Sequence, residues 1–397
     1  MKLLCLSFWT PPQLRPQSIL IGKMIPEWLR QGMQPVVLTY DGCGHWETAA
    51  PVVTIPAFER GRLAKFSRTL GRLMERRYFD RLVDIAARTI QAHGIRLVFS
   101  FANPMESNIL GALLKQRLGV VFISHFSDPY ADSPLKESSP RQRQLMLERE
   151  RLVVERSDRI VFVNDRLRHL VMKKYPEPLH SRGVVIPHCY DPALYGVWPR
   201  SNDRFIMSHV GVFYPNRQPE KLLLALALLK QRRPELEHAF RLRLIGGVNP
   251  YAGFSQERLE TLIRSFGLEN MVETLPTVDY GASLAHMAGS DALLALDADL
   301  PDSPFLPSKL IDYLGADRPI LALTPHNSPT WEVVTRLGGA AFPHHETEKI
   351  ATHLENLVLN GVHNAHDGIY AQQFSVANTT ARYLQLFERT LTECQAP

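Results

Sequence analysis

The sequence predicts an α/β protein built from two successive domains, each a parallel sheet covered by helices. Short apolar runs of strand length alternate with segments of helical periodicity along most of the chain, which is the pattern of repeated β-α units. The alternation stops once, at residues 191–203, where Pro, Gly, Trp, Ser and Asn occur without periodicity. With 397 residues the chain is long enough for two or three domains with large cores.

The composition is that of a globular protein in a reducing compartment. Hydrophobic residues make up 45% and charged residues 21% of the chain. The four cysteines are scattered, without a CxxC pair or a metal-binding spacing, so we expect free thiols. The first apolar run is too short for a signal sequence, and no run approaches the roughly 20 residues of a membrane span. We therefore predict a cytoplasmic protein.

The N-terminal half begins with a strand, a proline-rich loop, a helix and a second strand. Three prolines between residues 10 and 16 exclude a helix there. No G-x-G-x-x-G follows the first strand, so we expect no dinucleotide at this turn. The predicted strands of this half are 2–8, 35–40, 97–100, 120–124 and 159–163, and the predicted helices are 18–31, 62–91, 141–156 and 165–174.

The predicted helix 62–91 has one apolar face and an arginine-rich opposite face. Between Phe58 and Arg88 the sequence has nine basic and four acidic residues, and this local excess equals the +5 net charge of the whole chain. Two interpretations stay open: a solvated helix packed on the sheet, or a surface that contacts anionic lipid headgroups at the inner face of the membrane. We expect no nucleic-acid partner, because no nucleic-acid-binding motif accompanies the charge.

Two polar side chains follow the predicted strand 120–124. The carboxyl ends of strands line the ligand crevice of doubly wound sheets, so His125 and Asp128 lie where a cleft function is expected. The alternative is a loop that Asp128 and Pro129 turn locally through an Asx-type hydrogen bond. We favour the cleft role.

In the C-terminal half the β-α alternation starts again. The predicted strands are 205–210, 241–246, 272–275, 291–296, 320–323 and 340–342, and the predicted helices are 219–232, 257–266, 283–288, 308–315, 346–359 and 374–392. We expect Ser308 to cap the short helix, and Gly315 with Pro319 to stop it. The start of a helix attracts anions and disfavours cations, and Lys309 lies in the first turn. Two explanations stay open: the lysine and the helix start bind the same phosphate, or the lysine is solvated.

The segment Pro307-Ser-Lys-Leu-Ile-Asp-Tyr-Leu-Gly-Ala-Asp-Arg-Pro-Ile320 resembles the donor-binding segment of GT-B glycosyltransferases, above all the retaining enzymes of family 4. The typical sequence motif of these enzymes is P-S-K-x-x-E-Y-x-A-x-x-x-P. The resemblance implies that Asp312 faces the donor ribose and that Lys309 contacts the diphosphate. Ser308 and Leu310 belong to the same binding segment. It also implies two Rossmann-like domains facing a central cleft, with a C-terminal helix that crosses back to the N-domain.

The segment Gly211-Val-Phe-Tyr-Pro-Asn-Arg-Gln-Pro-Glu220 resembles the family's loop after the first strand of the C-domain. Gly211 would let the backbone approach the donor phosphates. The planar guanidinium of Arg217 matches phosphate oxygens, and the alternative is a surface arginine before a helix. By position in the family, Thr277 and Val278 are candidates for contact with the base.

Two further segments of the N-terminal half fit the same family. His125-Phe-Ser-Asp-Pro-Tyr130 resembles its F-R-D-P-W loop, which places His125 near the acceptor-side histidine. Residues 157–164 resemble the family's sequence motif at the end of the N-domain sheet, and residues 184–191 resemble its motif at the entry to the hinge. The implied domains are an acceptor domain at 1–190, a linker at 191–203, a nucleotide-sugar domain at 204–373 and the returning helix at 374–397.

Some positions depart from the family or suggest another chemistry. Val212 and Pro304 stand where many members have a basic residue and a glutamate. Asp297-Ala-Asp299 reads D-x-D, the metal motif of the other large glycosyltransferase fold, but its place after the C-domain strand 291–296 and before the donor helix argues against that role. Asp297, Asp299 or Asp302 could instead replace the missing glutamate in contacting the donor hexose.

The resemblance implies a glycosyltransferase that moves a sugar from a nucleotide-diphosphate sugar to a glycan or lipid-linked acceptor. We expect retention of the anomeric configuration, no obligatory metal and no cofactor besides the donor. The catalytic candidates are Arg217, Lys309, His125 and Asp128. Two alternatives stay open: a glycosyltransferase-like partner subunit with weak or no turnover, and a sugar-nucleotide epimerase on the same fold.

Overall fold

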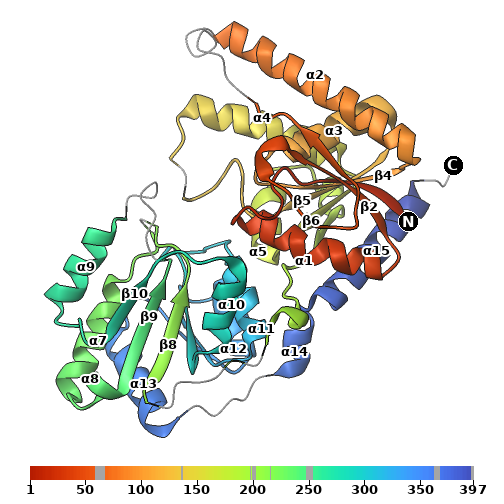
Figure 1. Cartoon of the computed structure of the whole chain (residues 1–397). Helices are drawn as coiled ribbons and strands as arrows, with labels where there is room; N and C mark the ends of the chain where they lie inside the picture. Colours follow the sequence, from red (N-terminus) through yellow and green to blue (C-terminus); the bar gives the residue numbers. More distant parts are fainter. Residues whose placement is uncertain are drawn as a thin grey trace. The chain divides into compact units, whose positions relative to one another are not determined.

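The computed structural model describes residues 1–58, 68–135, 137–196, 198, 203–214, 216–246, 254–361 and 367–394. The chain divides into two compact units (Figure 1). Unit 1 comprises Met1–His188 and Val376–Pro397, and unit 2 comprises Cys189–Ser375. The sequence-based boundaries were residues 190 and 374, so the observed divisions fall within two residues of them.

Unit 1 is a parallel sheet with helices on both faces. Its described strands have the order β3-β2-β1-β4-β5-β6-β7. They are β1 (Lys2–Leu6), β2 (Gln34–Tyr40), β3 (Val52–Ile55), β4 (Leu97–Phe101), β5 (Val121–Phe126), β6 (Arg159–Phe162) and β7 (Gly183–Val185). The helices are α1 (Pro16–Arg30), α2 (Arg68–His93), α3 (Glu106–Leu118), α4 (Pro140–Arg156), α5 (Asp165–Met172) and α6 (Glu177–His180).

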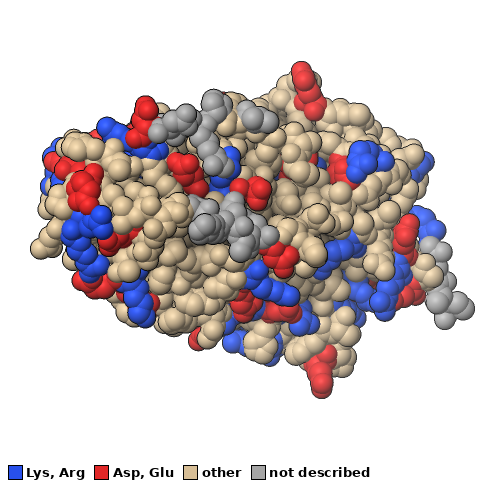
Figure 2. Space-filling model, turned by 90° about the horizontal axis from the view of Figure 1, so that it is seen from below, with Lys and Arg blue, Asp and Glu red and all other residues tan. Residues whose placement is uncertain are grey.

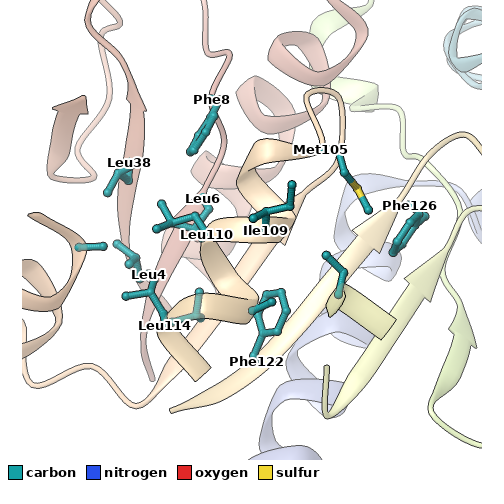
Figure 3. Packing of buried hydrophobic residues seen from close by; sticks show 14 of the residues in the cluster. Leu4, Leu6, Phe8, Leu38, Met105, Ile109, Leu110, Leu114, Phe122 and Phe126 are labelled. Carbon is teal, nitrogen blue, oxygen red and sulfur yellow. The ribbon is translucent and has the colours of Figure 1, made fainter. Parts of the chain in front are cut away.

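Part of the core of unit 1 lies between the sheet and α3. Figure 3 shows Ile109, Leu110 and Leu114 of α3 among apolar side chains of the strands, and all three are buried. The close approach requires a glycine in the helix, since a Cβ at Gly111 would lie 2.1 Å from the ring of Phe122. Helix α3 is therefore held against the sheet by packing rather than by its weak amphipathic pattern.

The last helix, α15 (Val376–Glu393), belongs to unit 1 and packs against α1. The ring of Trp28 lies 6.0 Å from Tyr383 and 5.8 Å from Phe387, measured between ring centroids. Gln31 Nε2 donates to the carbonyl oxygen of Ala377. The expected return of the C-terminal helix to the N-domain is confirmed.

Unit 2 repeats the architecture with the order β10-β9-β8-β11-β12-β13, again all parallel. Its described strands are β8 (Phe205–Val210), β9 (Phe240–Ile245), β10 (Val272–Leu275), β11 (Ala292–Leu296), β12 (Ile320–Leu323) and β13 (Ala340–Phe342). The helices are α7 (Glu220–Arg232), α8 (Leu236–Ala239), α9 (Gln256–Ser265), α10 (Tyr280–Ala288), α11 (Ser308–Ala316), α12 (Pro329–Arg336), α13 (Thr347–Asn360) and α14 (Gly368–Gln372). This strand order is the Rossmann order.

Several local predictions are corrected. Strand β5 continues to Phe126, so His125 lies inside a strand and not in the following loop. Helix α11 begins after Pro307 without a side-chain cap, so Ser308 is its first residue, and it runs past Gly315 to a left-handed Asp317. The first part of the predicted helix 62–91 lies outside the described residues, and α2 is described from Arg68.

Two further observations concern the chain as a whole. Within the described ranges, no helix is long and apolar enough to cross a membrane. All four cysteines are free thiols, three of them buried, as the sequence predicted.

Candidate functional site

The site begins where β8 and β11 of unit 2 lie side by side. The chain leaves these two strands toward opposite edges of the sheet, and ligands of doubly wound proteins bind at such a switch point. The strands pair at Met207 with Ala292 and at Ser208 with Leu293. The pairing of the two strands ends there.

Tyr313 of α11 links the two strands at this point. Its hydroxyl accepts a hydrogen bond from the backbone N–H of Val210 (2.9 Å) and donates to the carbonyl oxygen of Leu294 (3.2 Å). The side chain is fully buried, so both bonds are shielded from water. Tyr313 therefore fixes α11 against the end of the sheet, which brings the start of that helix to the switch point.

Gly211 and Lys309 are in direct contact. Gly211 follows β8 with a φ of +144°, a region that side chains disfavour. A Cβ at this position would lie 1.4 Å from Nζ of Lys309 and 2.5 Å from its Cε. Only glycine thus leaves room for the ammonium group above the backbone. No carboxylate in the described part of the chain forms a salt bridge with Lys309.

Arg217 reaches the same place from the loop after β8. Its amide and that of Tyr214 each donate to the other residue's carbonyl oxygen, at 2.8 and 3.2 Å, which closes a tight turn. The guanidinium is mostly buried, with Nη2 3.6 Å from Oδ1 of Asp297. Its Nε has no hydrogen-bond partner among the described residues. Asp297 therefore holds one side of the Arg217 guanidinium, while the Nε–H group can still donate a hydrogen bond to a ligand.

Asp297 is a buried carboxylate that follows β11. Oδ2 accepts hydrogen bonds from the hydroxyls of Thr324 (3.1 Å) and Thr330 (2.8 Å), and Oδ1 accepts from the amide of Ala298 (2.7 Å). These bonds satisfy a charge that would otherwise be costly to bury. The arrangement supports Arg217 and leaves little room for the hexose contact that the sequence allowed.

Burial and neighbouring positive charge lower the pKa of Lys309 and of a nearby histidine. Burial, and then the charge of Arg217, lower the pKa of Lys309 to about 7. Burial and the charge of Lys309 hold the pKa of His209 well below its usual value. Nδ1 of His209 contacts the carbonyl oxygen of Leu294 at 2.9 Å, so Nδ1 carries the proton and Nε2 keeps its lone pair. The site is electropositive and poised to gain charge when an anion binds.

The start of α11 adds backbone donors beside Lys309. The amides in the first turn of a helix lack partners within the helix, and those of Ser308 and Lys309 stand in this position. The amide of Leu310 donates to the carbonyl oxygen of Pro307, and its side chain is fully buried in the core. Leu310 therefore contributes packing, not an open surface for a ligand.

Asp312 lies one turn further along α11. Its Oδ1 accepts a hydrogen bond from the hydroxyl of Tyr280 (3.0 Å), and its backbone carbonyl accepts one from the hydroxyl of Tyr195 (2.7 Å). Burial and the Asp312 carboxylate both raise the pKa of Tyr280, so this phenol stays protonated and keeps donating. No local sequence pattern connects these two tyrosines with Asp312, because both are distant from it along the chain.

The base-side candidates lie at the ends of β9 and β10. Thr277 is exposed, and its Oγ1 would be 3.6 Å from a Cβ on Gly246, which follows β9 with a φ of +72°. Val278 is half-buried against the apolar cluster that also contains Leu310. Both lie at the carboxyl edge of the same sheet as Gly211.

Of the two candidates in unit 1, His125 lies inside strand β5 and Asp128 lies in the loop that follows it. His125 is fully buried among Phe99, Phe101 and His188, with ring centroids 6.4, 5.1 and 6.0 Å away. Burial lowers its pKa well below the usual range, so the ring is neutral. Asp128 lies in the loop after β5, where Oδ2 accepts from Nδ2 of Asn103 at 2.6 Å.

The two aspartates of the D-x-D sequence do not form a carboxylate pair. Asp297 points inward to its threonines, while Asp299 is exposed and donates its amide to the carbonyl oxygen of Asn216. Asp302 is exposed in a left-handed conformation with a φ of 55°. In the described ranges no group of three or more His, Cys, Asp or Glu side chains is arranged to hold a metal ion.

Comparisons with known proteins agree with this architecture. Residues 21–189 match the model of the Glycosyl transferase 4-like domain. No curated protein sequence matches the chain.

Solved structures resemble the whole chain at low sequence identity. Sucrose-phosphate synthase from Thermosynechococcus elongatus has a TM-score of 0.74 at 14% identity, covering 99% of this chain and 100% of that one. Anabaena HepE in complex with UDP-glucose has a TM-score of 0.66 at 16% identity, with 99% and 100% covered. A putative UDP-N-acetylglucosamine 2-epimerase from Listeria monocytogenes has a TM-score of 0.61 at 12% identity, with 99% and 97% covered.

The strand orders and these likenesses define the class: the chain has the GT-B fold of two Rossmann-like domains. Its N-terminal unit carries the glycosyl transferase 4-like domain, so the resemblance to family 4 is confirmed.

Proposed function

We propose that the protein transfers a sugar from a nucleotide-diphosphate sugar to a hydroxyl of a glycan or lipid-linked acceptor. The observation that carries the proposal is the contact of the Lys309 ammonium with Gly211 at the switch point, with Arg217 beside it. Two cations and free helix amides at the carboxyl edge of a Rossmann sheet suit a diphosphate. The GT-B fold supports a sugar nucleotide as its carrier, and Anabaena HepE has been solved with UDP-glucose.

The site's chemistry follows from where charge develops. When the bond between the sugar and the diphosphate breaks, negative charge grows on the leaving phosphate oxygens, and groups aimed at them lower the barrier. In this proposal the guanidinium of Arg217, the ammonium of Lys309 and the amides at Ser308 and Lys309 carry that charge without an obligatory metal. Asp312 would face the ribose of the donor nucleotide, and Thr277 and Val278 would contact its base.

The remaining parts of the proposal come from the resemblance to family 4. The anomeric configuration would be retained, and the acceptor would bind to unit 1, where His125 and Asp128 are the candidates. Asp128 is the more accessible of the two, because His125 has no exposed surface in this structure. We also keep the cytoplasmic location as a proposal.

A thermal-shift screen tests the donor site. UDP-, GDP-, ADP- and dTDP-sugars are compared on the wild type, on Arg217→Ala and on Arg264→Ala, which removes an exposed arginine of α9 as a matched control. A ligand that binds only the folded state adds about 2.7 kcal/mol at a hundredfold excess over Kd. We expect one nucleotide to stabilise the wild type and the control, and Arg217→Ala to lose that shift. If no nucleotide stabilises a well-folded wild type, the proposed donor site is wrong.

Turnover separates an enzyme from the alternatives. The nucleotide that binds is incubated with candidate acceptors, in buffer with EDTA, and the product is analysed by NMR for its anomeric configuration. A glycoside with the donor's configuration supports the full proposal. Epimerised sugar nucleotide without transfer would assign the chain to the epimerase alternative. Binding without transfer or donor hydrolysis would support the partner subunit.

A further inference from the structure

A groove lies on unit 1 between α2, α3 and α4. Helix α2 packs against α3 and α3 against α4, as Figure 1 also shows. The groove has a volume of about 640 Å³. That size is within the range of small-molecule sites, which hold roughly 300–1,000 Å³.

The floor of the groove is apolar. It is formed by Phe79 and Val83 of α2 and by Ile109 and Leu113 of α3. Three of these side chains belong to the buried core, and Leu113 is half-buried against it. The groove therefore offers a hydrophobic surface that is continuous with the core of the unit.

The rim of the groove is rich in arginine. Arg149 pairs with Glu75, and Arg117 pairs with Asp84 at 2.6 Å. Arg72 and Arg76 line the same groove one helical turn apart, are exposed, and form no salt bridge within the described ranges.

The rest of α2 continues this excess of charge. Arg77, Arg81 and Arg88 are also exposed on α2 and have no salt bridge among the described residues. Asp80 is the remaining carboxylate of the rim. By contrast, acidic residues accompany the basic ones across the face shown in Figure 2.

We propose that this groove binds one molecule of an anionic phospholipid. An acyl chain would lie on the apolar floor, and the phosphate would bind between Arg72 and Arg76, whose planar forks match phosphate oxygens. A free phosphate would leave the apolar floor exposed, and a neutral lipid would leave the two guanidinium groups unpaired. The helix then does more than attract a negatively charged surface: it holds a defined lipid. The proposal does not depend on the donor site.

Titration calorimetry with a soluble short-chain lipid tests the groove. The full chain is titrated with dihexanoylphosphatidylglycerol below its micellar concentration. Dihexanoylphosphatidylcholine has the same chains without net charge, and glycerol 3-phosphate has the headgroup chemistry without the chains. We expect the anionic lipid to bind at least about tenfold more tightly than either control, since both parts of the groove are then used.

Variants decide whether the groove or the general charge of α2 is responsible. At about 1 kcal/mol for each basic residue, Arg72→Gln with Arg76→Gln weakens binding roughly 30-fold. Arg81→Gln with Arg88→Gln removes the same charge from the same helix outside the groove, and binding to the soluble lipid is expected to stay within about threefold of the wild type. Leu113→Trp fills the groove, and Leu113→Gln makes its floor polar without adding bulk. Both should abolish binding while circular dichroism stays unchanged.

Three results would overturn the proposal. The first is equal loss in the two double variants, which would show diffuse attraction without a lipid site. The second is binding of glycerol 3-phosphate as tightly as the lipid, which would show an anion site only. The third is self-association of the wild type that Leu113→Gln abolishes, without lipid binding, which would assign the groove to a second copy of the chain.

Discussion

Replacing Gly211 by alanine perturbs the donor site at one atom. The new Cβ would lie 1.4 Å from Nζ of Lys309, whereas ordinary contacts begin at 3.4 Å. The ammonium group of Lys309 would have to move by about 2.0 Å to restore an ordinary contact, and the flexible end of the side chain allows this movement. Alanine also has to adopt the φ of +144°. Affinity and stability are therefore both expected to fall, for separate reasons.

The loss of affinity follows from Coulomb's law. Moving a unit charge from about 3 to about 5 Å from a phosphate costs about 2 kcal/mol at an effective dielectric constant of about 20. That corresponds to an approximately 30-fold weaker Kd for the nucleotide diphosphate. The strained backbone costs on the order of 1–3 kcal/mol of stability. In a domain of this size each kcal/mol lowers Tm by about 2–4 °C.

A double-mutant cycle is the assay. Kd for the nucleotide is measured by calorimetry at 25 °C for the wild type, Gly211→Ala, Lys309→Met and the double variant. If Gly211 acts by making room for Lys309, the double variant binds about as weakly as Lys309→Met alone, because the ammonium is already gone. Fully additive losses would refute this reasoning, and so would an unchanged Kd for Gly211→Ala.

Three further predictions concern protonation and packing. The pKa of Lys309 is about 7 in the free protein, and a bound diphosphate raises it. Affinity for the sugar nucleotide is therefore constant below pH 7 and falls above it, by up to about tenfold per pH unit. Calorimetry from pH 6 to 9 should find this slope in the wild type and not in Lys309→Met. Asp297→Ala leaves two buried hydroxyls and an amide without their acceptor, so urea unfolding should give a free energy of unfolding lower by about 2–4 kcal/mol, and an unchanged value would contradict the network. Gly111→Ala places a Cβ 2.1 Å from Phe122 and should cost about 1–3 kcal/mol although alanine favours helices, whereas Gly281→Ala in α10, with 3.4 Å of room, should be neutral or stabilising.

The regular elements of the fold could be predicted because their patterns are local. The apolar runs 205–210, 272–275, 320–323 and 340–342 are strands with the expected bounds. Helix α3 was not predicted, because its buried face includes Ser107, Asn108 and Gly111 and so carries no clear apolar stripe. Strand β3 was also missed. It is short and lies at the edge of the sheet, and Val52 at its start is 40% exposed.

The residues of the proposed donor site could be singled out from the sequence, but their contacts could not. Gly211, Arg217 and Lys309 were singled out by spacing and family resemblance, and the structure brings them to the same end of the sheet. The role of Asp297 depends on hydroxyls from Thr324 and Thr330, which no local pattern connects with it.

Two local errors have a common cause. Sequence patterns place the end of an element only within a few residues. Strand β5 ends two residues later than predicted and so includes His125, which is fully buried. Helix α11 has Pro307 at its N-cap, so Ser308 is one position too late to act as the cap. In both cases a small shift in a boundary changes what a side chain can do.

The central claim is that Arg217 and Lys309 hold a diphosphate. The most direct measurement compares Kd for the nucleoside diphosphate and the nucleoside monophosphate of the same base, in the wild type and in Arg217→Gln with Lys309→Met. Because hydrogen bonds to charged groups contribute about 1.5–3 kcal/mol each, the wild type should prefer the diphosphate by at least about tenfold, and the variant should lose that preference while keeping its affinity for the monophosphate. A preference that survives in the variant would contradict the account.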